Sequence, residues 1–139
     1  TAVESFAKLA DSIWFREGGG RSGGSSSSGG APPVLYVNQW VGSSLRWSDM
    51  GVSLAMDATM FAPGPATAAE IRVTEAPGGG SARFVLALRM PGWLDAGGRG
   101  GGGPVVAVNS VEWTDCPGPP TPGTYCRIER VWGRGDAVR

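Results

Sequence analysis

Residues Phe84–Met90 read FVLALRM, and this run decides the fold. Large apolar side chains occupy every second position from Phe84 to Met90, while Arg89 falls on the opposite side. A period of two is typical of a β-strand that turns one face toward a core. The run is too short and too regular in this period to favour a helix, so the chain around it is expected to form sheets.

Similar runs of period two recur on both sides of this stretch. Their apolar members are Leu35 and Val37, Val52 to Met56, Ile71 and Val73, Val105 to Val108, and Cys126 and Ile128 in the run Tyr125 to Trp132. Turns rich in Gly and Pro separate them, as in all-β folds with many short strands. The sequence therefore predicts a mainly β protein, an antiparallel β-sandwich over residues 34–139.

The first residues follow a different period. Val3, Phe6, Ala10 and Ile13 recur at helical spacing, which predicts a helix over residues 1–16. Residues 17–33 are dominated by Gly and Ser and cannot bury a core, so they are expected to form a flexible insert. The predicted organisation is one helix, an insert and a sandwich.

Composition excludes several classes of function. Twelve basic residues balance twelve acidic ones, so no net charge favours nucleic acid or an anionic membrane as partner. The chain has no His, which removes Ser-His-Asp catalysis and the commonest metal ligand. No apolar run approaches the roughly 18 residues of a membrane span. Nothing in the sequence indicates a compartment.

Two cysteines and several tryptophans are candidate functional residues. Cys116 and Cys126 lie ten residues apart. They are expected to be either free structural cysteines or partners in a disulfide across a hairpin. Without His partners, two thiols make a poor zinc site. Trp40 and Trp47 fall on strands or strand ends, where they would either stack on sugar rings or pack in the core.

Motifs across most of the chain resemble one enzyme family. These are ESFAKLADSIWF at Glu4–Phe15, LYVNQWV at Leu35–Val41, LRMPGW ending at Trp93, VAVN at Val106–Asn109, and the run from Gly123 to Asp136. Together and in this order they resemble the β-L-arabinofuranosidase-like glycoside hydrolases of family 127, closest to their plant-type branch. In that family the first motif follows two adjacent cysteines, so the resemblance implies a fragment that begins just after the catalytic Cys pair.

The resemblance also carries expectations about structure. The helix over 1–16 would be the last helix of an α/α-barrel catalytic domain, and 34–139 would be the sandwich that follows. In the family a further strand comes after the motif that ends in Gly135-Asp136, and we expect the chain to lack it. Glu4 and Ser5 would lie near the metal or contact sugar hydroxyls. For Glu4, the alternative is an exposed carboxylate in the first turn of a helix.

The implied activity is hydrolysis of β-L-arabinofuranosyl linkages in plant-type glycans. The family's proposed nucleophile is a zinc-bound cysteine thiolate with a glutamate as acid/base, and none of these residues can be matched to this chain. Zinc is therefore implied for the longer protein and not ligated here, and the fragment alone is expected to be inactive. The alternatives are a carbohydrate-binding module that acts through Trp40 and Trp47, and a purely structural β-sandwich.

Overall fold

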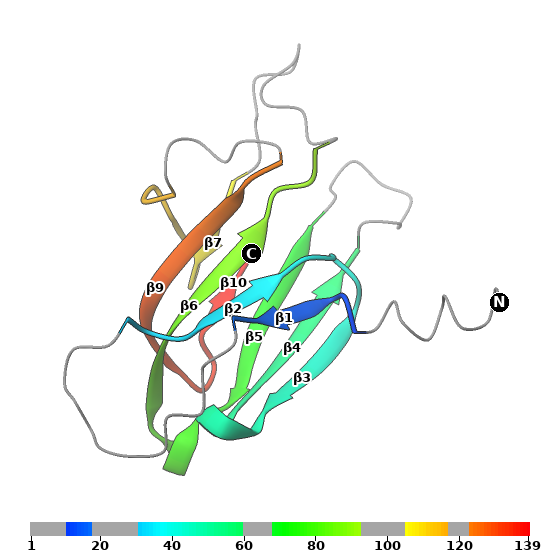
Figure 1. The fold of residues 1–139 in the computed structure, drawn as a ribbon. Helices are drawn as coiled ribbons and strands as arrows, with labels where there is room; N and C mark the ends of the chain where they lie inside the picture. The colour runs from blue at the N-terminus through cyan, green and yellow to red at the C-terminus, as the bar shows by residue number, and fades with distance from the viewer. Residues whose placement is uncertain (1–10, 18–30, 60–67, 93–104, 117–122) are drawn as a thin grey trace, which may run out of the picture.

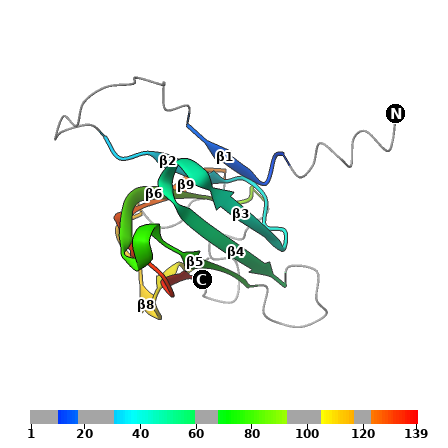
Figure 2. The same ribbon diagram turned by 90° about the horizontal axis from the view of Figure 1, so that it is seen from below.

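The chain folds into two β-sheets that pack face to face. The computed structural model describes residues 11–17, 31–59, 68–92, 105–116 and 123–139. Figure 1 shows the strands in chain order, and Figure 2, turned by 90°, shows the two sheets as two layers. The prediction of a mainly β sandwich is confirmed.

The first sheet has the strand order β1-β2-β6-β9. Its strands are β1 (Trp14–Arg16), β2 (Val34–Val37), β6 (Ser81–Arg89) and β9 (Tyr125–Gly133). β2 and β6 run parallel, whereas β1 pairs with β2 and β6 with β9 in antiparallel fashion. The FVLALRM run thus forms most of an inner strand, flanked by β2 on one side and β9 on the other.

The second sheet has the order β3-β4-β5-β10-β7-β8, and the pairings along it are antiparallel. Its strands are β3 (Ser43–Trp47), β4 (Val52–Ala58), β5 (Ala69–Glu75), β10 (Ala137–Val138), β7 (Ala107–Val108) and β8 (Val111–Glu112). Two short 3-10 helices, η1 (Ser48–Met50) and η2 (Pro77–Gly79), lie after β3 and β5.

The core lies between the sheets and follows from the alternation in the sequence. Phe84, Leu86 and Leu88 of β6 point inward and are almost fully buried, as is Ile128 opposite Leu86 on β9. Leu54 and Ile71 belong to the same cluster, from the facing sheet. Burying apolar surface in this way is the main favourable contribution to folding.

A strand replaces the end of the predicted N-terminal helix. Trp14, Phe15 and Arg16 form β1 and pair with β2, so the helix prediction is wrong for these residues. The ladder is extended by backbone hydrogen bonds from Asn38 N to Ile13 O, 2.9 Å, and from Glu17 N to Val34 O, 3.1 Å. Pairing with a distant strand outweighs the local helical pattern here, because propensity is a weak preference. Residues 11–13 form a turn, so the helix prediction is wrong there as well. Residues 1–10 of that prediction, and residues 18–30 of the insert predicted at 17–33, lie outside the described residues.

A short strand also follows Gly135-Asp136. β10 consists of Ala137 and Val138, and it pairs with both β5 and β7. In the resembling family a further strand follows this motif, and we expected the chain to lack that strand. The two-residue strand β10 lies directly after the motif.

Among the described residues, no helix has the length and apolar character needed to cross a bilayer.

Candidate functional site

Trp47 is part of the core and does not form a surface platform. Its side chain is 7% exposed, and its ring meets the Phe84 ring edge-on at a centroid distance of 5.6 Å. Stacking on a sugar requires an exposed ring face, and this ring is packed between the sheets. The interpretation of Trp47 as a sugar platform is therefore corrected in favour of the packing alternative.

Trp40 is partly buried and packs against the edge of the core. Its indole Nε1 donates a hydrogen bond to the backbone oxygen of Arg89, 2.9 Å away. This bond connects the segment after β2 to the end of β6. Part of the ring stays accessible, so a role for Trp40 in binding sugar remains a prediction. Glu4 and Ser5 lie outside the described residues.

Cys116 and Cys126 form a disulfide, the second of the two alternatives for these residues. Their Cα atoms are 4.9 Å apart, and both side chains are buried. The bridge ties the segment after β8 to the start of β9. Neither sulfur is then available as a thiolate, either as nucleophile or as metal ligand.

The described residues do not fit a zinc site. The chain has no His, and within the described ranges no three Cys, Asp or Glu side chains gather where they could hold a metal ion. Zinc sites in proteins require three or four nitrogen, sulfur or carboxylate ligands around one point. No chemistry through zinc is therefore assigned to these residues.

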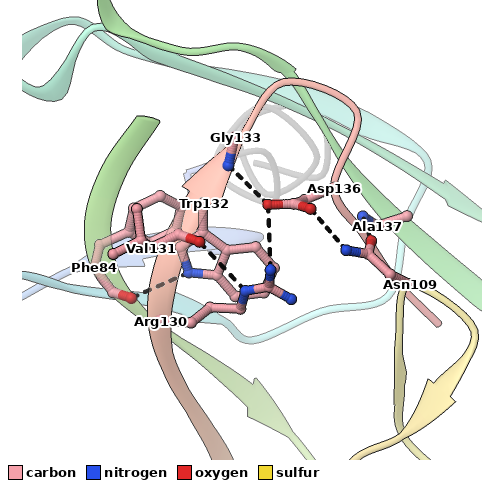
Figure 3. A network of polar contacts seen from close by, with 8 residues as sticks. All are labelled: Phe84, Asn109, Arg130, Val131, Trp132, Gly133, Asp136 and Ala137. Carbon is pink, nitrogen blue, oxygen red and sulfur yellow. Dashed lines mark hydrogen bonds and ion pairs between the residues drawn. The ribbon is translucent and has the colours of Figure 1, made fainter. Parts of the chain in front are cut away.

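A polar network surrounds Asp136 in the turn between β9 and β10 (Figure 3). Its Oδ2 accepts a hydrogen bond from Gly133 N and its Oδ1 accepts one from Asn109 Nδ2, both at 2.7 Å. Arg130 Nη2 lies 3.6 Å from Oδ2. Partial burial raises the pKa of Asp136, but the Gly133 amide, Asn109 and Arg130 outweigh it, so the pKa lies below its ordinary value.

The same network continues to the sheet and to an aromatic pair. Asn109 Oδ1 accepts a hydrogen bond from Ala137 N, 2.9 Å. The Arg130 guanidinium lies over the Trp132 ring, 5.0 Å from its centroid, and Trp132 Nε1 donates to Phe84 O. A lowered carboxylate pKa is a general hint of a functional site. The partners of Asp136 come from two turns and from β9, so the network fixes the two turns relative to the sheet. Sequence analysis gave no role to Asp136.

An aromatic row crosses the outer face of the first sheet, the face turned away from the second sheet. Phe15, Tyr36 and Tyr125 follow one another with centroid distances of 6.3 and 5.3 Å. The Arg127 guanidinium lies 5.9 Å from the Tyr36 ring centroid. Tyr125 donates to Asn38 Oδ1 at 2.6 Å. No local pattern in the sequence predicts this row, because it depends on pairing between distant strands.

Beside this row lies a groove of about 880 Å³. Val34 and Val85, which belong to the small outer-face cluster, line it together with Trp47 at the end of β3, so it lies where both sheets meet. Six charged side chains surround it: Arg16, Glu17, Asp49, Asp115, Arg127 and Glu129. We call this the outer groove. A smaller pocket of about 370 Å³ nearby, lined among others by Trp14, Leu45 and Arg46, shares Trp47, Arg16 and Asp49 with it.

The titratable side chains of the described residues all keep contact with solvent. No polar or charged residue among them is buried. General acids, bases and nucleophiles are commonly placed in partly desolvated positions that tune their pKa values.

Two packed, mainly antiparallel sheets around one apolar core define the chain as a β-sandwich domain. The family model described as β-L-arabinofuranosidase, GH127 middle domain, matches residues 34–139. The chain therefore belongs to this family of glycoside hydrolase middle domains, as its motifs indicated. No curated protein sequence matches the chain.

Solved structures support the same fold. The chain is similar to the crystal structure of Ara127N-Se, a GH127 β-L-arabinofuranosidase from Geobacillus stearothermophilus T6, with a TM-score of 0.63 and 23% identity. That match covers 99% of this chain and 17% of the other. A second structure, a glycoside hydrolase, matches with a TM-score of 0.51 and 24% identity over 75% of this chain and 15% of its own. The chain thus spans less than a fifth of these proteins.

Proposed function

We propose that this chain is the middle β-sandwich of a glycoside hydrolase that cleaves β-L-arabinofuranosyl linkages in plant-type glycans, and that it supports the catalytic part without supplying reacting groups. Membership of the GH127 middle-domain family supports the first half of this proposal. The match to 17% of a GH127 β-L-arabinofuranosidase supports the idea of one domain within a larger enzyme.

The observation that carries the supporting role is the chemistry of the described residues. Their core is apolar, no charged side chain is buried in it, and both cysteines are joined in a disulfide. Ordinary glycosidases use two carboxyl groups at defined separation, one of them with a raised pKa. The pKa of Asp136 is lowered, which is the opposite of the shift that such a general acid requires.

The zinc and the thiolate that the resemblance implies would be held outside this chain. The lack of a three-ligand cluster among the described residues supports this part of the proposal. In this proposal the sandwich provides a rigid neighbour for the catalytic part. A disulfide, a closed core and the fixed turns around Asp136 are features suited to that task.

Sequencing the transcript upstream of the Thr1 codon tests this proposal. The proposal predicts an open reading frame that encodes two adjacent cysteines shortly before Thr1, followed by a turn that contains glycine. A start codon immediately before Thr1, or an upstream sequence without the cysteine pair, would contradict the proposed place of this chain in a GH127-like enzyme.

A further inference from the structure

Strand β9 ends the first sheet, and its outer edge pairs with no strand among the described residues (Figure 1). It is nine residues long, whereas the other strands at the ends of the sheets, β1, β3 and β8, have three, five and two residues. Its ladder with β6 runs from Ser81↔Gly133 to Arg89↔Tyr125 without a register shift. A long and regular edge presents a row of unpaired N–H and C=O groups to which another strand can be added.

The register of β9 against β6 shows which of its backbone groups face outward. Glu129 lies opposite Val85. Val85 N donates to Pro33 O, 2.9 Å away, so Val85 directs its backbone groups toward β2 and away from β9. Opposite residues of an antiparallel pair exchange either both hydrogen bonds or neither. Glu129 therefore directs its N–H and C=O to the free edge, as do Arg127 and Val131, two positions to either side.

The side chains of the same residues form a self-complementary pattern on the outer face. Arg127, Glu129 and Val131 are exposed there, and Tyr125 is half-buried. Ile128 lies between the two charges and points into the core. When a second copy of β9 runs antiparallel with Ile128 opposite its counterpart, each Arg127 lies opposite Glu129 of the other copy. Each Tyr125 then lies opposite Val131 of the other copy.

Other registers of this pairing are disfavoured. A shift of one residue would bring the outer face of one copy against the inner face of the other. Registers centred on Arg127 or on Glu129 keep the faces but place two like charges directly opposite each other. Like charges in that position destabilise an antiparallel pair, whereas opposite charges stabilise it. The charge pattern therefore selects the register centred on Ile128.

The contacts that these side chains make within one chain leave them able to pair. Glu129 uses Oε1 in its ion pair with Arg83, and a carboxylate has a second oxygen that accepts hydrogen bonds. Arg127 donates from Nη1 to the Tyr36 hydroxyl at 3.4 Å, and a guanidinium carries five donors in all. Both side chains are thus held in place near the edge with capacity for one further partner.

Arg130 is the one charged side chain of β9 on the side of the core, and such a charge can block edge pairing. It is turned along its own chain, however, 3.6 Å from Asp136 and over the Trp132 ring. Its Nε also donates to Val131 O at 3.3 Å. Arg130 therefore competes for one edge group near the end of the strand and leaves the backbone groups at the centre free to pair.

We propose that β9 pairs antiparallel with β9 of a second copy of this chain, with the two-fold axis at Ile128. The pairing joins the four-stranded sheets of two copies into one continuous sheet. Backbone hydrogen bonds between Arg127 and Glu129 of the other copy hold its centre, and the two ion pairs set the register. The same patch is used by both copies, so the assembly closes at a dimer. This inference does not rest on the proposed function.

Sedimentation equilibrium of the complete 139-residue chain tests the dimer. It is measured over a range of protein concentrations at low ionic strength, because salt screens exposed charges. We expect a reversible equilibrium between monomer and dimer. Hydrogen exchange followed by NMR locates the contact. The amides of Arg127 and Glu129 should gain protection as the concentration rises, whereas that of Val85, bonded within the sheet, should be protected throughout.

Charge-swap variants test the register. Glu129→Arg and Arg127→Glu should each raise the dissociation constant of the dimer about ten-fold or more, because each places like charges opposite one another. An equal mixture of the two variants should form a heterodimer with near wild-type affinity, since every arginine again meets a glutamate. Asp57→Arg makes the same change of charge at an exposed position of β4 in the second sheet and should dimerise like the wild type. Thermal unfolding verifies that each variant is folded.

Several results would overturn the proposal. One is a monomer at every concentration, and another is a dimer whose affinity neither charge swap alters. Variants that fail to associate when mixed would contradict the register, and growth beyond two copies would contradict the closed two-fold contact. Protection of the Arg127 and Glu129 amides in the dilute monomer would show that the edge is covered within the chain, which also excludes this dimer.

Discussion

Asn109 donates a hydrogen bond to Asp136 across 27 residues of sequence, with 2.7 Å between Nδ2 and Oδ1. The first residue lies in the turn between β7 and β8, and the second lies in the turn between β9 and β10. Asn109 has a positive φ of 50°, a conformation that Asn tolerates better than most residues. The pair therefore fixes two turns that belong to different strand pairs (Figure 3).

Replacing Asp136 should loosen this connection. We expect Asp136→Asn to lower the free energy of unfolding by about 1–2 kcal/mol, because the new amide nitrogen faces donors that the carboxylate satisfied. Urea denaturation followed by tryptophan fluorescence measures the change. Asp57→Asn, at an exposed position on β4, is the control and should alter stability by less than about 0.5 kcal/mol. Equal effects of the two substitutions would contradict the role of the network.

The same carboxylate should give the stability a pH dependence. The pKa of Asp136 is lowered in the folded protein, whereas it is near 3.9 in an unfolded chain. The stabilisation of the folded state by the ionised Asp136 carboxylate is thus complete above about pH 4. It is lost as the pH falls through the lower pKa that Asp136 has in the folded protein. The urea midpoints of wild type and Asp136→Asn should converge as the pH falls below about 4. A difference that stays constant as the pH falls further below 4 would contradict this assignment.

Local alternation made much of the fold predictable. The FVLALRM run and the run from Tyr125 to Trp132 became β6 and β9 because each has one face in the core. That signal is contained in neighbouring residues and needs no knowledge of the partner strand. The Gly- and Pro-rich turns between such runs predicted the sandwich class, and the motifs predicted the family whose model matches residues 34–139.

Features that depend on distant partners were not predictable in this way. Trp14 pairs with Val37, and nothing near Trp14 in the sequence reveals that pairing, so the helical spacing before it was extended too far. The burial of Trp47 against Phe84 likewise depends on how the sheets face each other. The groove charges of Arg16 and Arg127 come together only once β1 and β9 belong to one sheet.

The two candidate tryptophans should differ in their effect on stability. Trp47→Ala should cost about 3–5 kcal/mol, as expected for a large ring removed from a core. Trp40→Ala should cost less, because the ring is only partly buried and makes one hydrogen bond to Arg89 O. Chemical denaturation of both variants measures the difference. A loss of under 1 kcal/mol for Trp47→Ala would restore the surface interpretation of Trp47.

The disulfide should make stability sensitive to reductant. Cys116 and Cys126 close a short loop with a sequence separation of 10, for which loop-closure entropy gives a stabilisation of roughly 2–3 kcal/mol. Reduction of the wild type should therefore lower its melting temperature. The double variant Cys116→Ala/Cys126→Ala is the control and should melt at the same temperature with and without reductant. Two free thiols in the native, unreduced protein would contradict the bridge.

The supporting role of this sandwich in a larger glycosidase is tested most directly by hydrolysis of a chromogenic β-L-arabinofuranoside. The chain alone and the same chain extended by its upstream coding sequence are assayed side by side with added zinc. We predict that the chain alone releases no chromophore and that the extended protein does. Hydrolysis by the chain alone would place reacting groups within these residues and contradict the account.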